Sequence, residues 1–388
     1  MIFVSKTASG ERIDYRDGKR YLWFLSVISP SVPLFSVILL AQTGQPLYAL
    51  LSIIVYFGLV PLLDWWIGED TNNPPEEIIE QLSGDQFYRI LLFASVPVFY
   101  ASFIATMIAV ATFGLPLWAM VALTIGAGVA SGSGLTVGHE LGHKPNRLDQ
   151  WGAKLINALT GYGHFCIEHN RGHHMLVATP EDPASARLGE NVYRFALREL
   201  PGTALRGWRM ERERLAKKSL GFWVWQNDLL QGYAITIAIA ATLIYTLGWI
   251  ILPFIVLHHI IGWLQLTLAN YVEHYGLLRQ KLPNGKYELC QPHHSWNTNH
   301  IASNLMLFHL QRHSDHHANP LRPYQSLRNF AELPHLPSGY PGSYALALIP
   351  PLWFSTMDKK VRRWAGGDVT KTNLDPVYAD SYRGAHAT

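Results

Sequence analysis

The sequence predicts an all-α membrane protein with six transmembrane helices in three hairpins, and a cytoplasmic helical cap that carries clusters of histidines. Composition supports the membrane class, because 49% of the 388 residues are hydrophobic and only 15% are charged, against roughly 25% charged in an average soluble domain. The 18 histidines support the cap, because most of them gather at or after the ends of apolar stretches.

Six stretches are apolar over the length of about 17–25 residues that a helix needs to cross the hydrocarbon core. They are residues 23–41, 47–63, 90–111, 115–137, 229–249 and 253–272. Only the short links QTGQP, TFG and IIL separate the two members of each consecutive pair. We therefore expect three helical hairpins.

Basic residues indicate the orientation of these hairpins. None of the three links contains Lys or Arg. The opposite side of the membrane carries Lys6, Arg12, Arg16, Lys19, Arg20, the 64–89 loop, the 138–228 region and the 273–388 region. By the positive-inside rule, both termini are cytoplasmic. The outward links are too short to hold a domain, so the chemistry must lie in the membrane or on its cytoplasmic face.

We expect residues 1–369 to form one integral-membrane domain, with a loose C-terminal tail over 370–388.

The composition of the chain excludes several classes of function. The formal charge of +3 gives no strong field that would attract nucleic acid. Two cysteines, Cys166 and Cys290, are too few for a thiolate zinc or iron–sulfur site. No convincing G-x-G-x-x-G is present, so any electrons must come from another protein.

Four glycines in the fourth stretch, Gly126, Gly128, Gly132 and Gly134, allow two interpretations. Small residues let membrane helices approach closely. Alternatively, the missing side chains leave room for an apolar substrate. We favour close packing of helices.

The end of the fourth stretch contains His139-Glu140-Leu141-Gly142-His143, a match to H-E-x-x-H. In metalloproteases this pattern supplies two zinc ligands one helical turn apart and a glutamate as general base. A catalytic zinc takes three protein ligands. A protease would therefore leave about six clustered histidines without a role.

Three further groups of histidines each lie at or after a cytoplasmic membrane exit. The nine candidate ligands are His139, His143, His169, His173, His174, His274, His313, His316 and His317. Spacings of three and four residues put side chains on one helix face. We expect these pairs each to grip one ion: His139 with His143, His169 with His173, and His313 with His316 or His317. Adjacent histidines point about 100° apart and suit two metals. Nine imidazoles therefore indicate two ions with open positions, a layout suited to O₂ chemistry.

The other histidines have different expected roles. His258 and His259 lie about 22 Å along a helix from His274, near the outer surface, and are expected to be core residues. Four more lack the ligand spacing and fit supporting or surface positions: His164, His293, His294 and His300. His309 is left open as a ligand, because it lies four residues before His313.

Carboxylates accompany the candidate ligands. A metal-bound imidazole usually donates its other N–H to a carboxylate or carbonyl, which fixes the tautomer. Five residues are candidates for this role: Glu140, Glu168, Glu273, Asp182 and Asp315. Glu273 is the most persuasive, because a carboxylate at a membrane exit is costly unless it is paired. It is also a candidate for direct metal binding.

HELGHK, EHNRGHH and LQRHSDHH resemble the three histidine boxes of the integral-membrane di-iron superfamily, which includes fatty acid desaturases, sterol and xylene hydroxylases, and alkane hydroxylases. NYVEHYGL, HHMLVATPEDPASAR, LQRHSDHHANPLRPYQ and DWWIGEDTNNP are similar to the bacterial alkane 1-monooxygenase branch in particular. The resemblance runs from about residue 64 to residue 325, and the six-span layout agrees with it.

The resemblance implies an enzyme of the bacterial inner membrane that uses two non-haem iron ions and O₂ to hydroxylate the terminal methyl of medium-chain n-alkanes. It implies electrons from rubredoxin, which an NAD(P)H-dependent reductase reduces, and the nine histidines carry over as the iron ligands. An n-alkane offers only apolar burial, at about 0.8 kcal/mol per CH₂. Such a substrate can enter sideways from the bilayer.

Several alternatives remain. The same metal site can desaturate an acyl chain, or hydroxylate a ring methyl or a fatty acid. A membrane metal transporter can also be rich in histidine, although its spans should carry polar residues.

The basic stretch RGWRMERERLAKK (Arg206, Arg209, Arg212, Arg214, Lys217 and Lys218) has two interpretations. It is a docking site for acidic rubredoxin, or an interfacial helix held by anionic lipid, which we favour.

Overall fold

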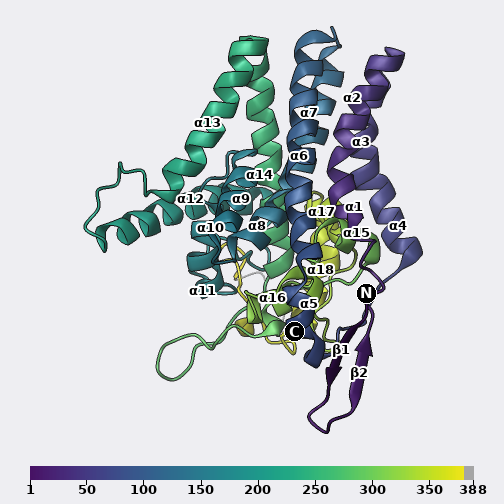
Figure 1. Ribbon diagram of the computed structural model, residues 1–388. Helices are drawn as coiled ribbons and strands as arrows, with labels where there is room; N and C mark the ends of the chain where they lie inside the picture. The colour runs from purple at the N-terminus through teal and green to yellow at the C-terminus, as the bar shows by residue number, and fades with distance from the viewer. Residues whose placement is uncertain (380–388) are drawn as a thin grey trace.

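The computed structural model describes residues 1–379, which are largely helical. Within these residues, six helical stretches are long and apolar enough to cross a membrane, the number that the sequence predicts. They are Phe24–Thr43, Pro46–Ile67, Gln86–Thr112, Leu117–Gly142, Asp228–Leu247 and Trp249–His274. Figure 1 shows the upright helices side by side and the rest of the chain gathered at one end. The chain is therefore an all-α membrane protein.

The spans are composite helices joined by tight turns. Their elements are α1 (Phe24–Ile28), η1 (Ser29–Ser31), α2 (Val32–Thr43), η2 (Pro46–Leu50), α3 (Leu51–Ile54), η3 (Val55–Leu59), α4 (Val60–Ile67), α6 (Gln86–Thr112), α7 (Leu117–Ser133), α8 (Leu135–Gly142), α13 (Asp228–Leu247), η5 (Trp249–Ile251) and α14 (Leu252–His274). Gly44 ends α2 with a φ of 67°, a left-handed conformation that glycine adopts without strain. The turns after α2, α6 and α13 lie at the same end of the molecule in Figure 1.

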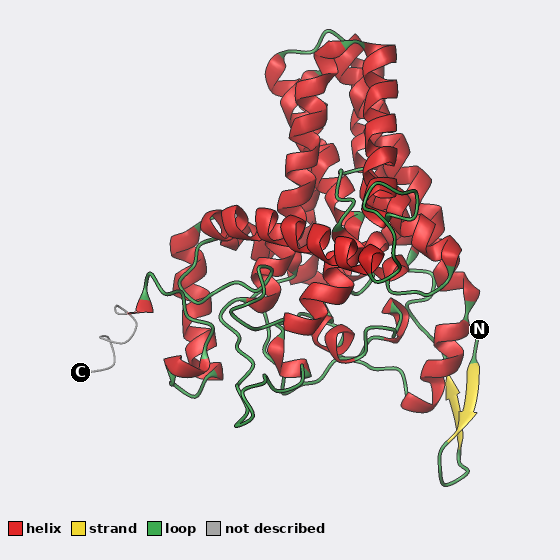
Figure 2. Cartoon of the chain, turned by 90° about the vertical axis from the view of Figure 1, so that its left-hand side faces the viewer, coloured by secondary structure: helices red, strands yellow, loops and turns green. Residues whose placement is uncertain are grey.

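The cap consists of short helices and one long one. Its elements are α5 (Glu76–Gly84), α9 (Arg147–Ala158), α10 (Phe165–Glu168), η4 (His169–His173), α11 (His174–Leu176), α12 (Val192–Ala216), η6 (Pro292–His294), α15 (Ile301–Met306), α16 (His313–Ala318), η7 (Tyr324–Ser326), α17 (Tyr340–Ala347), α18 (Pro350–Trp364) and η8 (Val369–Lys371). In Figure 2, which faces the left-hand side of Figure 1, α12 runs crosswise at the base of the upright helices. This end of the molecule contains the histidine clusters.

The N-terminus adds a small β-hairpin to the predicted all-α fold. Strands β1 (Phe3–Lys6) and β2 (Arg12–Tyr15) pair antiparallel, with Phe3 opposite Tyr15. Gly10 has a φ of 88° in the turn between them. A four-residue strand is too short to be recognised in a hydropathy profile that six long apolar spans dominate.

Close packing explains the glycines of α7. A Cβ built on Gly128 would lie 2.7 Å from the Cβ of Ile261 in α14, and one on Gly132 would lie 2.6 Å from the Cβ of Gln265. A Cβ on Gly126 would likewise lie 2.6 Å from the Cβ of a serine in α3. The favoured interpretation, close helix approach, is confirmed.

The segment expected to be a loose tail is bound to the domain along its first part. The carbonyl of Asn373 accepts the Leu188 N–H at 2.6 Å, and the Asn373 N–H donates to the Gly276 carbonyl at 3.0 Å. Asp375 forms an ion pair of 2.8 Å with Arg194 of α12. These contacts join residues far apart in sequence, so local composition does not indicate them. The predicted range 380–388 lies outside the described residues.

Gly128→Ala should destabilise the protein by about 1–3 kcal/mol, because the added methyl meets Ile261 and the His258 carbonyl with no space to spare. Gly58→Ala is the matched control, since a Cβ there meets nothing within 4 Å. Thermal unfolding in detergent measures the difference. Equal midpoints for the two variants would contradict the tight contact between α7 and α14.

Candidate metal centre

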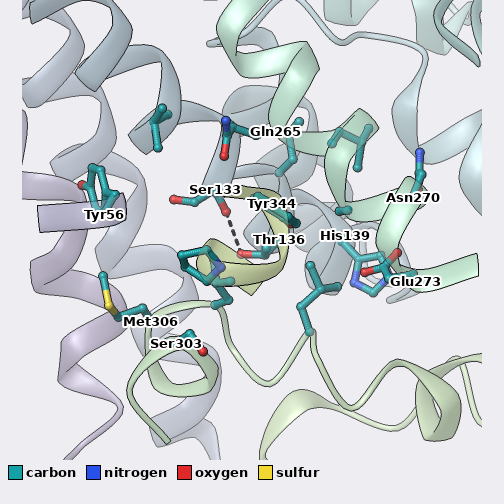
Figure 3. A pocket seen from close by; sticks show the side chains of 18 of the residues that line it. Tyr56, Ser133, Thr136, His139, Gln265, Asn270, Glu273, Ser303, Met306 and Tyr344 are labelled. Atoms are coloured by element: carbon teal, nitrogen blue, oxygen red, sulfur yellow. Dashed lines mark hydrogen bonds between the residues drawn. The ribbon is translucent and has the colours of Figure 1, made fainter. Parts of the chain in front are cut away.

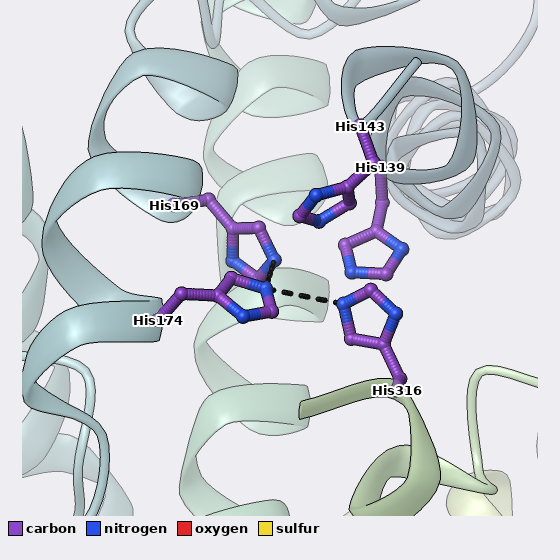
Figure 4. Close-up of side chains that lie close together, drawn as sticks. All are labelled: His139, His143, His169, His174 and His316. Atoms are coloured by element: carbon purple, nitrogen blue, oxygen red, sulfur yellow. Dashed lines mark hydrogen bonds between the residues drawn. The ribbon is translucent and has the colours of Figure 1, made fainter. Parts of the chain in front are cut away.

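All nine candidate histidines converge in two groups. The first contains His139, His143, His169, His174 and His316, and the second contains His173, His274, His313 and His317. Within each group, one nitrogen from every residue lies within 4.8 Å of the others. Figure 4 shows the first group, in which imidazoles from three separate segments face one another. The groups adjoin, because the ring centroids of His174 and His317 are 4.5 Å apart.

Adjacent histidines are divided between the two groups. His173 and His317 belong to the second group, whereas their neighbours His174 and His316 belong to the first. This division follows from the turn of about 100° per residue in a helix. The two groups therefore share two short segments, residues 169–174 and 313–317, and their geometry suits two neighbouring ions.

The predicted pairing of His169 with His173 is wrong, and a local change of helix type explains why. Segment η4 is π-helical, with the His174 N–H bonded to the His169 carbonyl. A π-turn superposes residues five apart, and the Nε2 atoms of His169 and His174 accordingly lie 3.1 Å apart. In α16 the ordinary spacing holds, because the Nε2 atoms of His313 and His317 lie 2.8 Å apart.

Burial favours the neutral form of imidazoles such as His169 and His174, whereas at His173 the Asp182 carboxylate outweighs burial and raises the pKa. Loss of solvent, followed by the proximity of His174, lowers the pKa of His169 well below its usual value. Loss of solvent, followed by the proximity of His143, likewise lowers the pKa of His174 to about 2. A neutral imidazole retains a lone pair, which is the form that binds metal.

The donor set fits metal ions. Among the nine candidate ligands, all within the described residues, four buried Nε2 atoms have no hydrogen-bond partner: those of His139, His143, His173 and His274. Leaving a buried polar atom unpaired costs about 1–3 kcal/mol, and native structures rarely do so. A cation between these nitrogens removes the cost. Imidazole suits zinc, copper, iron and nickel, so the ligands alone do not select the metal.

In two candidate ligands, a hydrogen-bond acceptor outside the groups fixes the proton on the Nδ1 atom. His173 donates its Nδ1–H to Asp182 Oδ2 at 2.9 Å, and His274 donates its Nδ1–H to the His294 carbonyl at 3.3 Å. Burial alone would raise the pKa of Asp182, but His173 and Arg206 outweigh it and hold this pKa well below its usual range. Each contact leaves the Nε2 lone pair directed into the group.

Arg206 belongs to this site, although the sequence placed it in an exposed basic stretch. Its Nη2 donates to Asp182 Oδ1 at 2.7 Å, and its Nε donates to Glu168 Oε1 at 2.7 Å. Arg206 therefore links Glu168 to Asp182, the carboxylate that contacts His173. These residues lie 24 and 38 positions from Arg206, so no local pattern announces the network.

Glu273 is a second carboxylate beside a candidate ligand. Its Oε2 is 3.2 Å from His313 Nε2, and its Oε1 accepts the Tyr340 hydroxyl proton at 2.6 Å. The carboxylate therefore approaches the nitrogen that faces the second group, within reach of any ion held there. Tyr340, which orients it, was not a predicted site residue.

Glu140 and Asp315 make their hydrogen bonds elsewhere. Glu140 accepts the backbone N–H of Tyr324 at 3.2 Å. Asp315 accepts from the Arg322 guanidinium at 2.9 Å and from the backbone N–H of Arg328 at 2.9 Å. Both carboxylates thus hold the 322–328 segment against the histidine-bearing helices, and neither has a hydrogen bond to an imidazole among the described residues.

The histidines given other roles lie outside both groups. His258 contacts the Ser131 hydroxyl at 2.9 Å. His309 donates its Nδ1–H to the Tyr324 carbonyl at 3.1 Å and packs edge-on against Trp23. His309 therefore faces away from the candidate metal centre.

A third group, Glu288, His293 and His294, has its donor atoms within 4.8 Å of one another, but its chemistry disfavours metal. The Gln291 N–H donates to His294 Nδ1 at 2.9 Å. In the neutral ring the proton must then be on Nε2, which lies 3.2 Å from Glu288 Oε1 and donates to it. A nitrogen that carries a proton is no ligand.

An apolar pocket leads to the histidines from the membrane-spanning helices. It encloses about 900 Å³, including its open part. Its lining includes Tyr56, Phe57, Val129, Leu266, Met306 and Tyr344 together with His139, His169 and His313. In Figure 3, Tyr56 and Met306 lie at the end of the pocket away from His139 and Glu273. The pocket therefore brings an apolar molecule to both groups.

Comparison with known proteins identifies related sequences. The fatty acid desaturase family matches residues 114–345. The chain is 48% identical to "Alkane 1-monooxygenase 1" of Alcanivorax borkumensis, over 95% of this chain and 91% of that protein. It is 48% identical to "Alkane 1-monooxygenase" of Ectopseudomonas oleovorans, over 95% and 92% respectively. The hydroxylase component XylM of a Pseudomonas putida xylene/toluene monooxygenase is 30% identical over 59% of this chain and 61% of its own length.

Asp182→Asn should weaken metal binding by about 10–100-fold, because the amide holds His173 less firmly in its ligating tautomer. Asp149→Asn is the matched control: Asp149 is equally buried and paired with Arg89 at 2.8 Å, but it contacts none of the nine histidines. Metal content after dialysis against a graded chelator measures the effect. Equal retention in both variants would contradict a role of Asp182 in holding the ligand.

Proposed function

Because the chain belongs to the alkane 1-monooxygenases of the fatty acid desaturase family, we propose that it hydroxylates the terminal methyl group of medium-chain n-alkanes. The overall reaction is R–CH₃ + O₂ + 2e⁻ + 2H⁺ → R–CH₂OH + H₂O. The observation that carries the proposal is an apolar pocket that ends on two adjoining groups of imidazoles.

We assign two non-haem iron ions to these groups. His139, His143, His169, His174 and His316 hold one ion, and His173, His274, His313 and His317 hold the other. When bound, the irons supply the activation of O₂ and the redox change. Asp182 and the His294 carbonyl keep the second nitrogens of their ligands protonated, and Glu273 is placed to bind or orient at the second ion.

The pocket supplies the rest of the specificity. An n-alkane has no hydrogen-bonding group, so its affinity comes from apolar burial at about 0.8 kcal/mol per CH₂. Polar groups of the wall such as Thr136 and Tyr56 have their own partners: the Thr136 hydroxyl donates to the Ser133 carbonyl at 2.8 Å, and the Tyr56 hydroxyl donates to the Ser29 carbonyl at 2.7 Å. Such a wall excludes water and directs the chain end to the histidines.

Topology and electron supply complete the proposal. The histidine end lies on the cytoplasmic side of a bacterial inner membrane, with both termini there; the absence of Lys and Arg from the span links supports this orientation. The electrons come from rubredoxin, which an NAD(P)H-dependent reductase reduces. The alkane comes from the bilayer and enters the pocket from the side of the spans.

A reconstituted assay with rubredoxin, its reductase, NADH and n-octane should yield 1-octanol, identified by gas chromatography. Purified protein should contain about two irons per chain. His274→Ala should abolish the product while the protein still inserts in the membrane, because His274 supplies one of four nitrogens of the second group.

His259→Ala is the matched control for this assay, since His259 is a histidine of the same helix outside both groups. An alkene or a hydroxylated ring methyl as the only product would replace alkane hydroxylation by a related reaction. One zinc per chain without iron would overturn the di-iron assignment.

Met306→Trp should shift the preferred alkane to shorter chains, because the larger side chain fills the end of the pocket away from the histidines. Met306→Leu conserves the volume and should leave the preference close to that of the wild type. Competition among n-alkanes of graded length in one reaction gives the ratio of products. An unchanged ratio in the tryptophan variant would show that this end of the pocket does not hold the alkane.

A further inference from the structure

We propose that the electron donor docks directly over the first histidine group, on a cytoplasmic surface named here the His143–His174 face. This inference rests on the proposed function and adds the place where electrons are received. To this face we assign seven exposed or partly exposed residues that adjoin the ligands of the first group in sequence: His143, Lys144, Arg147, Arg171, His174, Met175 and Leu321. Its occupant is a soluble one-electron carrier with an acidic surface.

Partial exposure of two ligand rings is the first observation. Of the nine candidate ligands, seven are buried, whereas His143 and His174 are only half-buried. Their ring centroids lie 4.8 Å apart. A carrier that covers these rings reaches the candidate metal centre without any intervening side chain, and electron tunnelling slows steeply with distance.

The two ligand-bearing segments form one continuous surface. Asn170 Nδ2 donates to the Gly142 carbonyl at 2.8 Å, which ties η4 to the end of α8. Pro145, Asn170 and Arg171 line a common hollow there. Figure 1 shows α11 and α16 at the end of the molecule away from the span tips. This surface is therefore open to a soluble protein.

The charge of the face selects the carrier. Arg147 and Arg171 are exposed, and within residues 1–379 neither these two nor Lys144 forms an ion pair. Exposed apolar side chains accompany them, since Met175 is 68% and Leu321 is 76% exposed. Cations around apolar contacts attract and seat an acidic protein.

The basic stretch on α12 is a weaker docking surface. Arg206 is committed to Asp182 and Glu168, and Arg214 to Glu211. Large apolar side chains are exposed on α12 just before this stretch, since Leu197 is 80% and Leu205 is 67% exposed. A helix of this composition at the base of the spans lies in the lipid headgroups.

Each carrier molecule gives up one electron on this face and leaves oxidised. Two carriers, two protons and one O₂ complete a turnover, and the products are one alcohol and one water. The alkane reaches the histidines from the opposite direction, through the apolar pocket.

The test uses the iron-loaded protein in nanodiscs and reduced rubredoxin as the probe. Arg147→Glu/Arg171→Glu should raise both the Kd and the KM for rubredoxin about tenfold or more at low ionic strength, because like charges then face the carrier. At high salt the difference should shrink, since the Debye length falls to about 3 Å at 1 M. Iron content and reduction of the metal by dithionite should match the wild type.

Leu321→Asp is a second variant that leaves the cations in place and should weaken binding in the same direction. Arg209→Glu/Arg212→Glu on α12 is the matched control and should bind rubredoxin like the wild type. Wild-type binding by the face variants, or a loss confined to the α12 variant, would overturn the docking surface alone. A wild-type protein that forms no alcohol would instead remove the proposed function.

Discussion

Nine imidazoles share one buried volume only while most of them are uncharged and their lone pairs face one another; His173, whose pKa is raised, has the Asp182 carboxylate beside it. Burial supplies the first condition, because it lowers the pKa of rings such as His169 well below the usual value. Hydrogen bonds from outside supply the second, because Asp182 and the His294 carbonyl hold the protons of their rings on the outward nitrogens. Without a cation, the inward nitrogens are costly unpaired groups. The site therefore has a strong electrostatic reason to bind metal.

A local change of helix type lets one short backbone segment supply ligands to both groups. One π-turn places His169 over His174 and releases His173 to the second group. A short segment thereby supplies ligands to both groups, and π-turns inside helices are frequent at functional sites. Arg206 then joins the cap helix α12 to His173 through Asp182. The position of α12 and the orientation of the His173 ring consequently depend on each other.

Sequence reasoning reached the six spans and the nine histidines because both signals are local: hydropathy over about 20 residues, and histidines three to five positions apart. It paired His169 with His173 because it assumed an ordinary α-helix, and no residue type marks the π-turn. It also mistook Arg206 for a surface cation, because Asp182 and Glu168 meet it only in the folded chain. Other contacts between distant segments, such as that of Tyr340 with Glu273, could not be predicted from the sequence for the same reason.

The two histidines of H-E-x-x-H show how the site divides its surroundings. His139 lines the apolar pocket, whereas His143, one helical turn further on, is partly exposed at the surface of the cap. Their rings remain 4.9 Å apart, so a single turn of α8 crosses from the hydrocarbon side to the aqueous side of the candidate metal centre. An apolar substrate and a charged electron carrier need solvents of opposite kind. Placing ligands on both sides of one boundary lets each approach from its own phase without displacing the other.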